Sequence, residues 1–258
     1  MPEIAHNNSN TSPDYLIVRR RWVTAHGLRK LLASLKGSDE PYRTLYVKPD
    51  SQNPGPYVGR EVADILREIP TSETGLAIFQ GQDSAIAISP PFPIEKDSSA
   101  EGLDSSPLTE ILDRNLTVGV VLLRLGNYAI GVIRGEKLIA SKSGSRHVKS
   151  RHKQGGSSQR RFERSRERLV REIFDKACDI MRTIFEPYEK RLDYIMLGGE
   201  KTTLEGLEKR CAYLTKTGVE VMGRHLAVER PGKIALEKIH HEVWKSHVYE
   251  LERVPYTP

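Results

Sequence analysis

The chain has 258 residues, of which 38% are hydrophobic and 29% are charged, a composition typical of a globular protein with its own core. No apolar run approaches the roughly 18 residues that a membrane-spanning helix needs, so we expect no membrane contact. The net charge of +6 is unevenly distributed, because eleven Lys and Arg residues and only two Glu residues lie between Lys142 and Arg171. Two interpretations of this segment stay open, a polyanion bound there or a solvated basic surface.

The N-terminal region begins with a polar stretch over 1–15, which predicts a disordered tail without the apolar core of a signal peptide. The basic segment 18–35 is partly amphipathic and predicts a surface helix. A β-strand is expected at 42–50, where a proline-containing turn ends it, and helical spacing of apolar residues predicts a helix at 59–69.

The middle of the chain predicts a hairpin at 74–94, a polar loop at 95–106 and a short helix at 107–115. Three close strands are then expected at 116–125, 128–134 and 137–142. These three segments are apolar and separated by short glycine-containing turns, which favours a meander within one sheet.

The second half of the chain begins with a loop over 143–157, which is rich in Gly, Ser and basic residues. A continuous apolar stripe then predicts a long helix over 158–186, ended by Pro187. The remaining expected elements are a strand at 192–199, a helix at 202–215, one or two strands at 217–229 and a last helix at 232–247. Strands interleaved with helices indicate an α/β fold around a mixed β-sheet flanked by helices, which we expect to form one domain over 16–258.

Metal and thiol chemistry finds little support in the sequence. The two cysteines, Cys178 and Cys211, each stand alone, which fits a reducing cytoplasm and excludes a thiolate zinc cage built by this chain. His240 and His241 are adjacent on a predicted helix and should therefore point in different directions. No carboxylates are clustered as in a two-metal nuclease, so we expect neither a metal nor another cofactor.

The segment 151–166, RHKQGGSSQRRFERSR, sets two glycines inside the basic region. Gly155 and Gly156 permit close backbone approach and positive φ angles. The N-terminus of the following helix presents free N–H groups, which suit a phosphate or a developing oxyanion. The GK[ST] ending of a P-loop and the GxGxxG pattern are both missing.

HKQGGSSQRRF (152–162), placed after three strands and before a long helix, resembles the middle domain of class 1 eukaryotic and archaeal release factors. Those proteins carry a Gly-Gly-Gln tip in this context, and Gly155, Gly156, Arg161 and Phe162 match it. The resemblance covers roughly residues 40 to 230. It implies an RNase H-like fold in which the long helix carries a glycine-rich tip.

The match departs from the release factors at Ser157, which stands where they have their catalytic glutamine. The next glutamine is Gln159, and this shifted pattern resembles release-factor-like peptidyl-tRNA hydrolases related to the eukaryotic ankyrin-repeat and zinc-finger factor of ribosome quality control. The sequence contains neither the zinc finger and ankyrin repeats of that factor nor the codon-reading domain of true release factors.

The resemblance implies a cytoplasmic, monomeric peptidyl-tRNA hydrolase that frees nascent chains on stalled large ribosomal subunits. Gln159 would position the water that attacks the ester, because an amide can hold water through its oxygen and donate through its NH₂. Gly155 and Gly156 would let this group enter a narrow site. Gln154 is the competing glutamine, and we expect it to act mainly as an RNA contact.

Contacts to rRNA and tRNA are expected from the basic residues around the glycines. They are Arg151, Lys153, Arg160, Arg161 and Arg164. Three alternatives stay open: cleavage within the tRNA near its 3′ CCA end, a non-catalytic rescue factor that binds the ribosome, and a general RNA-binding domain.

Overall fold

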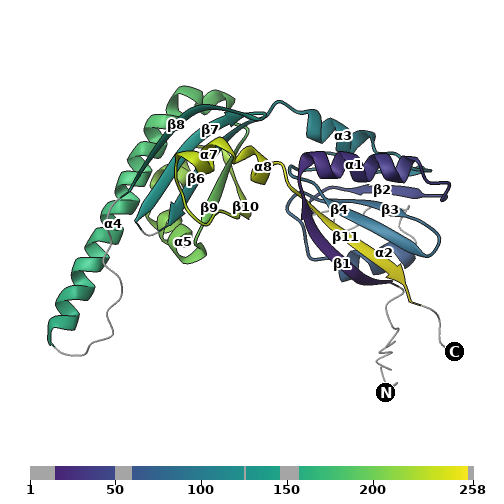
Figure 1. The fold of residues 1–258 in the computed structure, drawn as a ribbon, viewed down its shortest axis with the longest axis horizontal. Coiled ribbons are helices and arrows are strands. Elements are labelled where there is room, and N and C mark those ends of the chain that lie inside the picture. Colours follow the sequence, from purple (N-terminus) through teal and green to yellow (C-terminus); the bar gives the residue numbers. More distant parts are fainter. Residues whose placement is uncertain (1–14, 50–59, 125, 146–156, 255–258) are drawn as a thin grey trace, which may run out of the picture. The chain divides into compact units, whose positions relative to one another are not determined.

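The computed structural model describes residues 15–49, 60–124, 126–145 and 157–254 (Figure 1). The chain forms two compact units, where the sequence led us to expect one domain over 16–258. Unit 1 is Met1–Leu112 together with Lys245–Pro258, and unit 2 is Asp113–Trp244. The difference arises because the last strand of the described chain pairs with the first one and so belongs to the sheet of unit 1.

Unit 1 contains a six-stranded sheet in which all neighbouring strands are antiparallel. The strand order is β1 (Tyr15–Val23), β11 (Ser246–Arg253), β4 (Ser84–Ser89), β3 (Leu76–Gln80), β2 (Arg43–Val47) and β5 (Ser98–Glu101). Its helices are α1 (Ala25–Lys36), α2 (Arg60–Glu68) and α3 (Ser106–Asp113).

One core cluster of unit 1 forms where α2 packs on the sheet. Val62 and Ile65 of α2 are buried in one cluster with Leu251 of β11. The hydroxyl of Thr24 caps α1 by accepting a hydrogen bond from the Gly27 amide at 3.2 Å, a common N-cap arrangement.

Most expected elements of unit 1 are confirmed, and three differ. The first part of the helix predicted over 18–35 is strand β1, because three consecutive arginines conceal the period-two alternation in which Tyr15 and Ile17 face the core. Tyr15 is buried and belongs to this strand, whereas the rest of the predicted tail lies outside the described residues. The loop predicted over 95–106 contains the short strand β5, and β11 was not predicted.

Unit 2 contains a five-stranded mixed sheet, which confirms the α/β class with a mixed sheet flanked by helices. The strand order is β10 (Glu220–Leu226), β9 (Tyr194–Gly199), β6 (Thr117–Arg124), β7 (Asn127–Arg134) and β8 (Lys137–Ser145). The first three strands are mutually parallel, and β7 and β8 form an antiparallel meander with β6.

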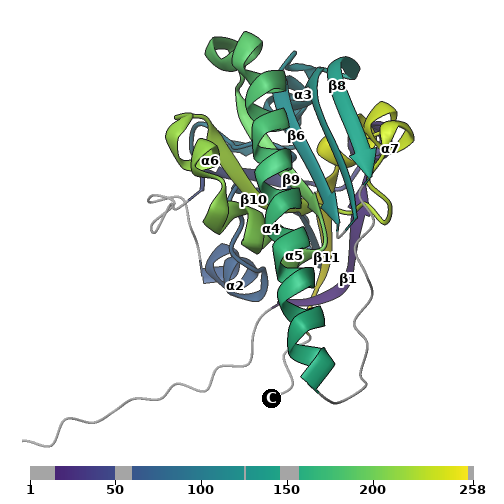
Figure 2. The same ribbon diagram turned by 90° about the vertical axis from the view of Figure 1, so that its left-hand side faces the viewer.

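Helices cover both faces of this sheet (Figure 2). One face is packed by α4 (Ser157–Phe185), the 3₁₀ helix η1 (Glu186–Arg191), α5 (Lys201–Arg210) and α6 (Ala212–Lys216). On the other side lies α7 (Lys233–Glu237), and α8 (His240–Val243) follows it in the chain. Gly131 lies between Ile130 and Val132, whose side chains pack on the α4 side of the sheet. A Cβ on Gly131 would therefore point to the opposite face, and it would lie 3.4 Å from Leu236 of α7.

The long helix predicted over 158–186 is confirmed almost to the residue as α4. At the two ends of the loop predicted over 143–157, β8 continues to Ser145 and α4 begins at Ser157, and the rest of this predicted loop lies outside the described residues. The predicted helix 202–215 is divided at Cys211, and the predicted helix 232–247 is two short helices followed by β11.

Candidate functional site

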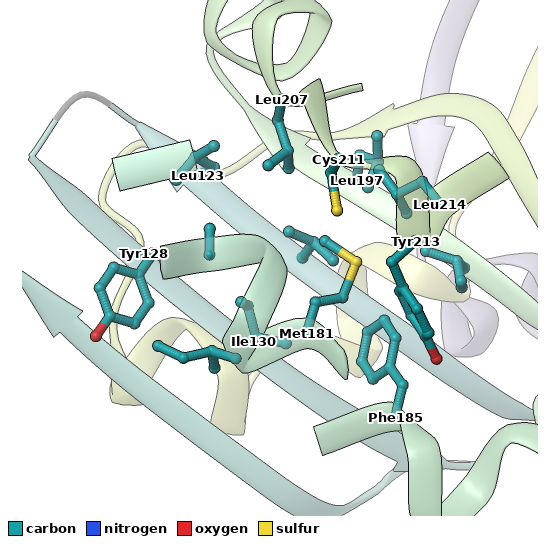
Figure 3. Close-up of a cluster of buried hydrophobic side chains, with 14 of the residues drawn as sticks. Leu123, Tyr128, Ile130, Met181, Phe185, Leu197, Leu207, Cys211, Tyr213 and Leu214 are labelled. Carbon is teal, nitrogen blue, oxygen red and sulfur yellow. The ribbon is translucent and has the colours of Figure 1, made fainter. Parts of the chain in front are cut away.

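The helix α4, with 29 residues, has two halves that differ in burial. Its second half, 173–185, packs against the sheet. The buried side chains of this half are Ile173, Phe174, Ala177, Ile180, Met181 and Phe185. Figure 3 shows Met181 and Phe185 in the cluster that they share with residues of β6, β7, β9, α5 and α6. This anchored half therefore fixes the direction of the helix.

The first half of α4, residues 157–172, is called the arm here. None of its described side chains is buried, and the first buried residue of the helix is Ile173. At 1.5 Å per residue, Ser157 lies about 24 Å along the axis from Ile173. In Figures 1 and 2 the corresponding end of α4 extends past the end of the unit 2 sheet.

The anchored half is fastened at several points. The phenyl ring of Phe185 packs directly on Gly119 of β6. A Cβ at Gly119 would come within 2.8 Å of the ring, so this position has no room for a side chain. Asp175 accepts two hydrogen bonds from the Arg210 guanidinium of α5, at 2.6 and 2.8 Å. This hydrogen bonding lowers the pKa of the Asp175 carboxyl below its ordinary value.

A disulfide between Cys178 of α4 and Cys211 also joins these elements. The expectation that each cysteine stands alone was wrong, because the packing of α5 along α4 brings the start of α6 to the anchored half. A separation of 33 residues in sequence gives no sign of this proximity. The Cα atoms are 5.6 Å apart, a usual separation for a disulfide.

The arm is basic, with six Arg and three Glu residues among 157–172. Arg164, Arg168 and Arg171 are all exposed. Spacings of four and three residues place them on one side of the helix, and Arg160 precedes them at the same spacing. Ala177 is buried against the sheet and lies on a different side of the helix from these arginines. The arginines therefore form a stripe that faces away from the line of buried residues.

The structure describes part of the predicted site. Arg151, Lys153, Gln154, Gly155 and Gly156 lie outside the described residues. For Gln159, Arg160 and Arg161 the helical backbone of the first two turns is described, and for Arg164 the exposed side chain as well.

By helical register, Gln159 lies eighteen residues, or about five turns, before Ala177 and thus on the same line of the helix. Arg160 and Arg164 occupy a different line. The predicted water-positioning residue and the arginine stripe thus begin on different sides of the arm. Arg168 and Arg171 were not assigned from the sequence, although their spacing from Arg164 would have placed them in this stripe.

Within the described residues, no three His, Cys, Asp or Glu side chains are grouped so that they could hold a metal ion. The rings of His240 and His241 lie 4.0 Å apart, so the expectation that they point in different directions was wrong; α8 is a short helix that begins at His240 itself. Burial lowers the pKa of His240, and the neighbouring His241 adds to the shift.

Among the described helices, none has the length and apolar character to span a bilayer.

A family model described as "Actinobacteria/chloroflexi VLRF1 release factor" matches residues 116–249, just over half of the chain. The chain belongs to this VLRF1 release factor family. The matched segment runs from the residue before β6 into β11 and includes the whole of α4. Most of unit 1 lies outside the VLRF1 match.

The curated relatives of this VLRF1 family member include peptide chain release factor subunit 1 of two archaea. The protein from Methanopyrus kandleri is 33% identical over an alignment of 147 residues, which covers 52% of this chain and 35% of that protein. The protein from Archaeoglobus fulgidus is 28% identical over an alignment of 136 residues, which covers 51% of this chain and 33% of that protein. The chain thus spans about a third of the length of the curated relatives it matches.

A solved structure of an archaeal translation termination factor, aRF1, is similar with 18% identity and a TM-score of 0.34. The similarity covers 81% of this chain and 67% of that one. Because this score is below 0.5, the VLRF1 assignment rests on the family match.

Proposed function

We propose that the chain is a peptidyl-tRNA hydrolase that frees nascent chains on stalled large ribosomal subunits. The observation that carries this proposal is the arm. The chain belongs to a release factor family, and its basic arm begins at Ser157, directly after Gly155 and Gly156 in the sequence. None of the described side chains of the arm is buried. An unburied, charged half-helix does not serve the core, so its residues are available to an external polyanion.

The proposed reaction at the glycine-rich tip is hydrolysis of the ester bond between the peptide and the tRNA. An ester is more reactive than an amide, so placing a water and stabilising the oxyanion supply much of the required rate. Gln159 is the water-positioning residue in this proposal. The N-terminus of α4 begins two residues earlier, at Ser157, and its dipole favours negative charge developing nearby.

The arginine stripe binds RNA phosphates in this proposal. Arg164, Arg168 and Arg171 are exposed and continue the row of Arg160, so they present charge along several turns. Arg151, Lys153, Gln154 and Arg161 add contacts to rRNA and tRNA around the tip. We propose that the protein acts in the cytoplasm as a monomer and needs no cofactor.

The position of the catalytic glutamine is the part of the proposal that departs from the release factors. Ser157 follows the glycines, and Gln159 comes two residues later. This arrangement resembles the hydrolases related to the ankyrin-repeat and zinc-finger factor, and it supports Gln159. Gln154 precedes the glycines and contributes to binding.

The test uses large ribosomal subunits that carry a labelled peptidyl-tRNA. Gln159→Ala should bind these subunits normally and release peptide on the order of a hundredfold more slowly, because the lost interaction belongs to the transition state. Gln154→Ala, the matched control on the other side of the glycines, should lower release only modestly.

Mapping the 3′ end of the released tRNA separates the alternatives. An intact CCA end supports ester hydrolysis, whereas a shortened end with CCA on the peptide means tRNA cleavage. Binding without any release by the wild type would indicate a non-catalytic rescue factor. Normal release by Gln159→Ala with loss in Gln154→Ala would overturn the chosen position of the motif.

A further inference from the structure

Unit 1 has an aromatic and cationic surface at the edge of its sheet, outside the arm. On the antiparallel pair β1 and β11, Arg20 lies opposite Tyr249 and Trp22 lies opposite His247. Directly opposite residues share a face, as do residues two apart on one strand. All four side chains therefore project from the same face of the sheet.

The rings on this face are stacked on one another. The Trp22 indole lies parallel to the His247 imidazole, with ring centroids 4.5 Å apart and planes at 9°. The centroid of the Tyr249 ring lies 4.3 Å from that of the His247 imidazole, and the Tyr249 hydroxyl is 2.8 Å from Nδ1 of His247. Trp22 is nevertheless 49% exposed. The indole is thus supported from beneath and half open to solvent.

Arg20 places a positive charge on this face. Of the three consecutive arginines in β1, Arg19 and Arg21 both form ion pairs with Glu250, at 3.9 and 2.8 Å. Arg20 lies on the aromatic face, and no carboxylate in the described part of the chain is within ion-pair distance of it. Burial, and secondly the charge of Arg20, lower the pKa of His247, which favours the neutral imidazole in the stack.

Hydroxyl groups continue the row beside the rings. Ser89 of β4 lies opposite His247 and therefore projects from the same face. Its Oγ is 2.5 Å from the hydroxyl of Ser72 and 3.1 Å from that of Thr74. These hydroxyls bond one another, and the Thr74 hydroxyl donates to the Pro90 carbonyl, so this network fixes Ser89 beside the rings.

The composition of this face favours an RNA partner over an apolar protein surface. The other exposed large apolar residues of β1 do not extend it, because Leu16 lies opposite Glu252 on the other face and Val18 lies in the bulge of the strand. One exposed indole beside an arginine matches a base and its phosphate.

We propose that Arg20, Trp22 and His247 form a second RNA-contact surface, on which an unpaired nucleobase stacks against Trp22 while Arg20 contacts the phosphate. This surface belongs to unit 1, so the inference does not depend on Gln159 or on hydrolysis.

The experiment follows the fluorescence of the full-length protein during titration with a short unstructured RNA. The other tryptophan, Trp244, is only 4% exposed, so quenching reports mainly on Trp22. We expect quenching in the wild type and also in Arg164→Glu, which reverses one charge of the arginine stripe on the arm. An abasic oligomer of equal charge should quench far less. Cross-linking of 5-bromouridine RNA, followed by peptide mapping, should identify Trp22.

Paired variants separate stacking from charge. Trp22→Leu should weaken RNA binding about tenfold in the Arg164→Glu background, and Trp22→Phe should retain most of it. Arg20→Gln should weaken binding several-fold and reduce its salt dependence, whereas the matched control Arg19→Gln on the other face should not. Equal effects of these two arginine variants, or equal binding of the abasic oligomer, would overturn the proposal. Absence of RNA quenching together with Trp22-dependent binding to rRNA-free ribosomal proteins would assign the face to a protein instead.

Discussion

The arm and the anchored half of α4 share one continuous helical backbone but differ in what stabilises them. The anchored half buries six side chains against the sheet, whereas no described side chain of the arm is buried. Isolated helices of this length are marginally stable, so the arm depends on the anchored half to continue its helix. The comparison teaches that burial fixes the helix at one end and leaves the residues at the other end free to serve binding.

The largest expected effect is on the anchored half. Phe185→Ala should lower the free energy of unfolding by about 3–5 kcal/mol, because it empties a fully buried site beneath Gly119. Arg164→Ala on the arm should change it by no more than about 0.5 kcal/mol. Urea denaturation measures both. Similar losses in the two variants would contradict the division of α4 into two halves.

The disulfide should come next. Cys178→Ser should lower the free energy of unfolding by about 3 kcal/mol, since the bond closes a loop of 33 residues in the anchored region. A reducing agent should lower the wild type to the same value and leave Cys178→Ser unchanged. If the reducing agent does not alter the wild-type urea midpoint, the two thiols are unpaired in solution.

A smaller effect should separate two arginines on one line of α4. Arg164 on the arm and Arg182 on the anchored half are eighteen residues apart and both exposed. Arg164→Glu should weaken association with large subunits about tenfold at moderate salt, and Arg182→Glu should leave it nearly unchanged. Sedimentation at several salt concentrations measures both. Equal losses would mean that general charge, and not the arm, drives association.

The smallest effect concerns the ion pair beside the disulfide. Arg210→Ala should lower the free energy of unfolding only slightly, because Asp175 and Arg210 are both well exposed and solvent screens their attraction. The lowered pKa of Asp175 stabilises the fold above the ordinary carboxyl pKa, and this contribution is lost as the pH falls through the folded value. The difference from the wild type should therefore shrink in acid. A difference that grows in acid would contradict the pairing.

The helical repeat of apolar residues made α4 predictable, and the continuous apolar runs separated by glycine-containing turns made the β6–β8 meander predictable. Contacts between distant segments were not predictable in this way. Nothing local reveals that β11 pairs with β1, that Cys178 meets Cys211, or that Trp22 stacks on His247. In the candidate site, the charge around the glycines pointed to Arg160, Arg161 and Arg164 but not to Arg168 and Arg171, and the role given to Gln159 came from resemblance and stays a prediction.

The return of β11 to the sheet of unit 1 makes unit 2 an insertion within unit 1. In this sheet Tyr15 pairs with Arg253, so the pairing closes across nearly the whole chain. Contacts so distant in sequence carry a high loop-closure entropy and form slowly. During synthesis, unit 2 can fold as soon as its own residues have left the ribosome, while β1 and β4 wait for the strand that separates them. Unit 1 therefore completes its fold after the domain that is inserted into it.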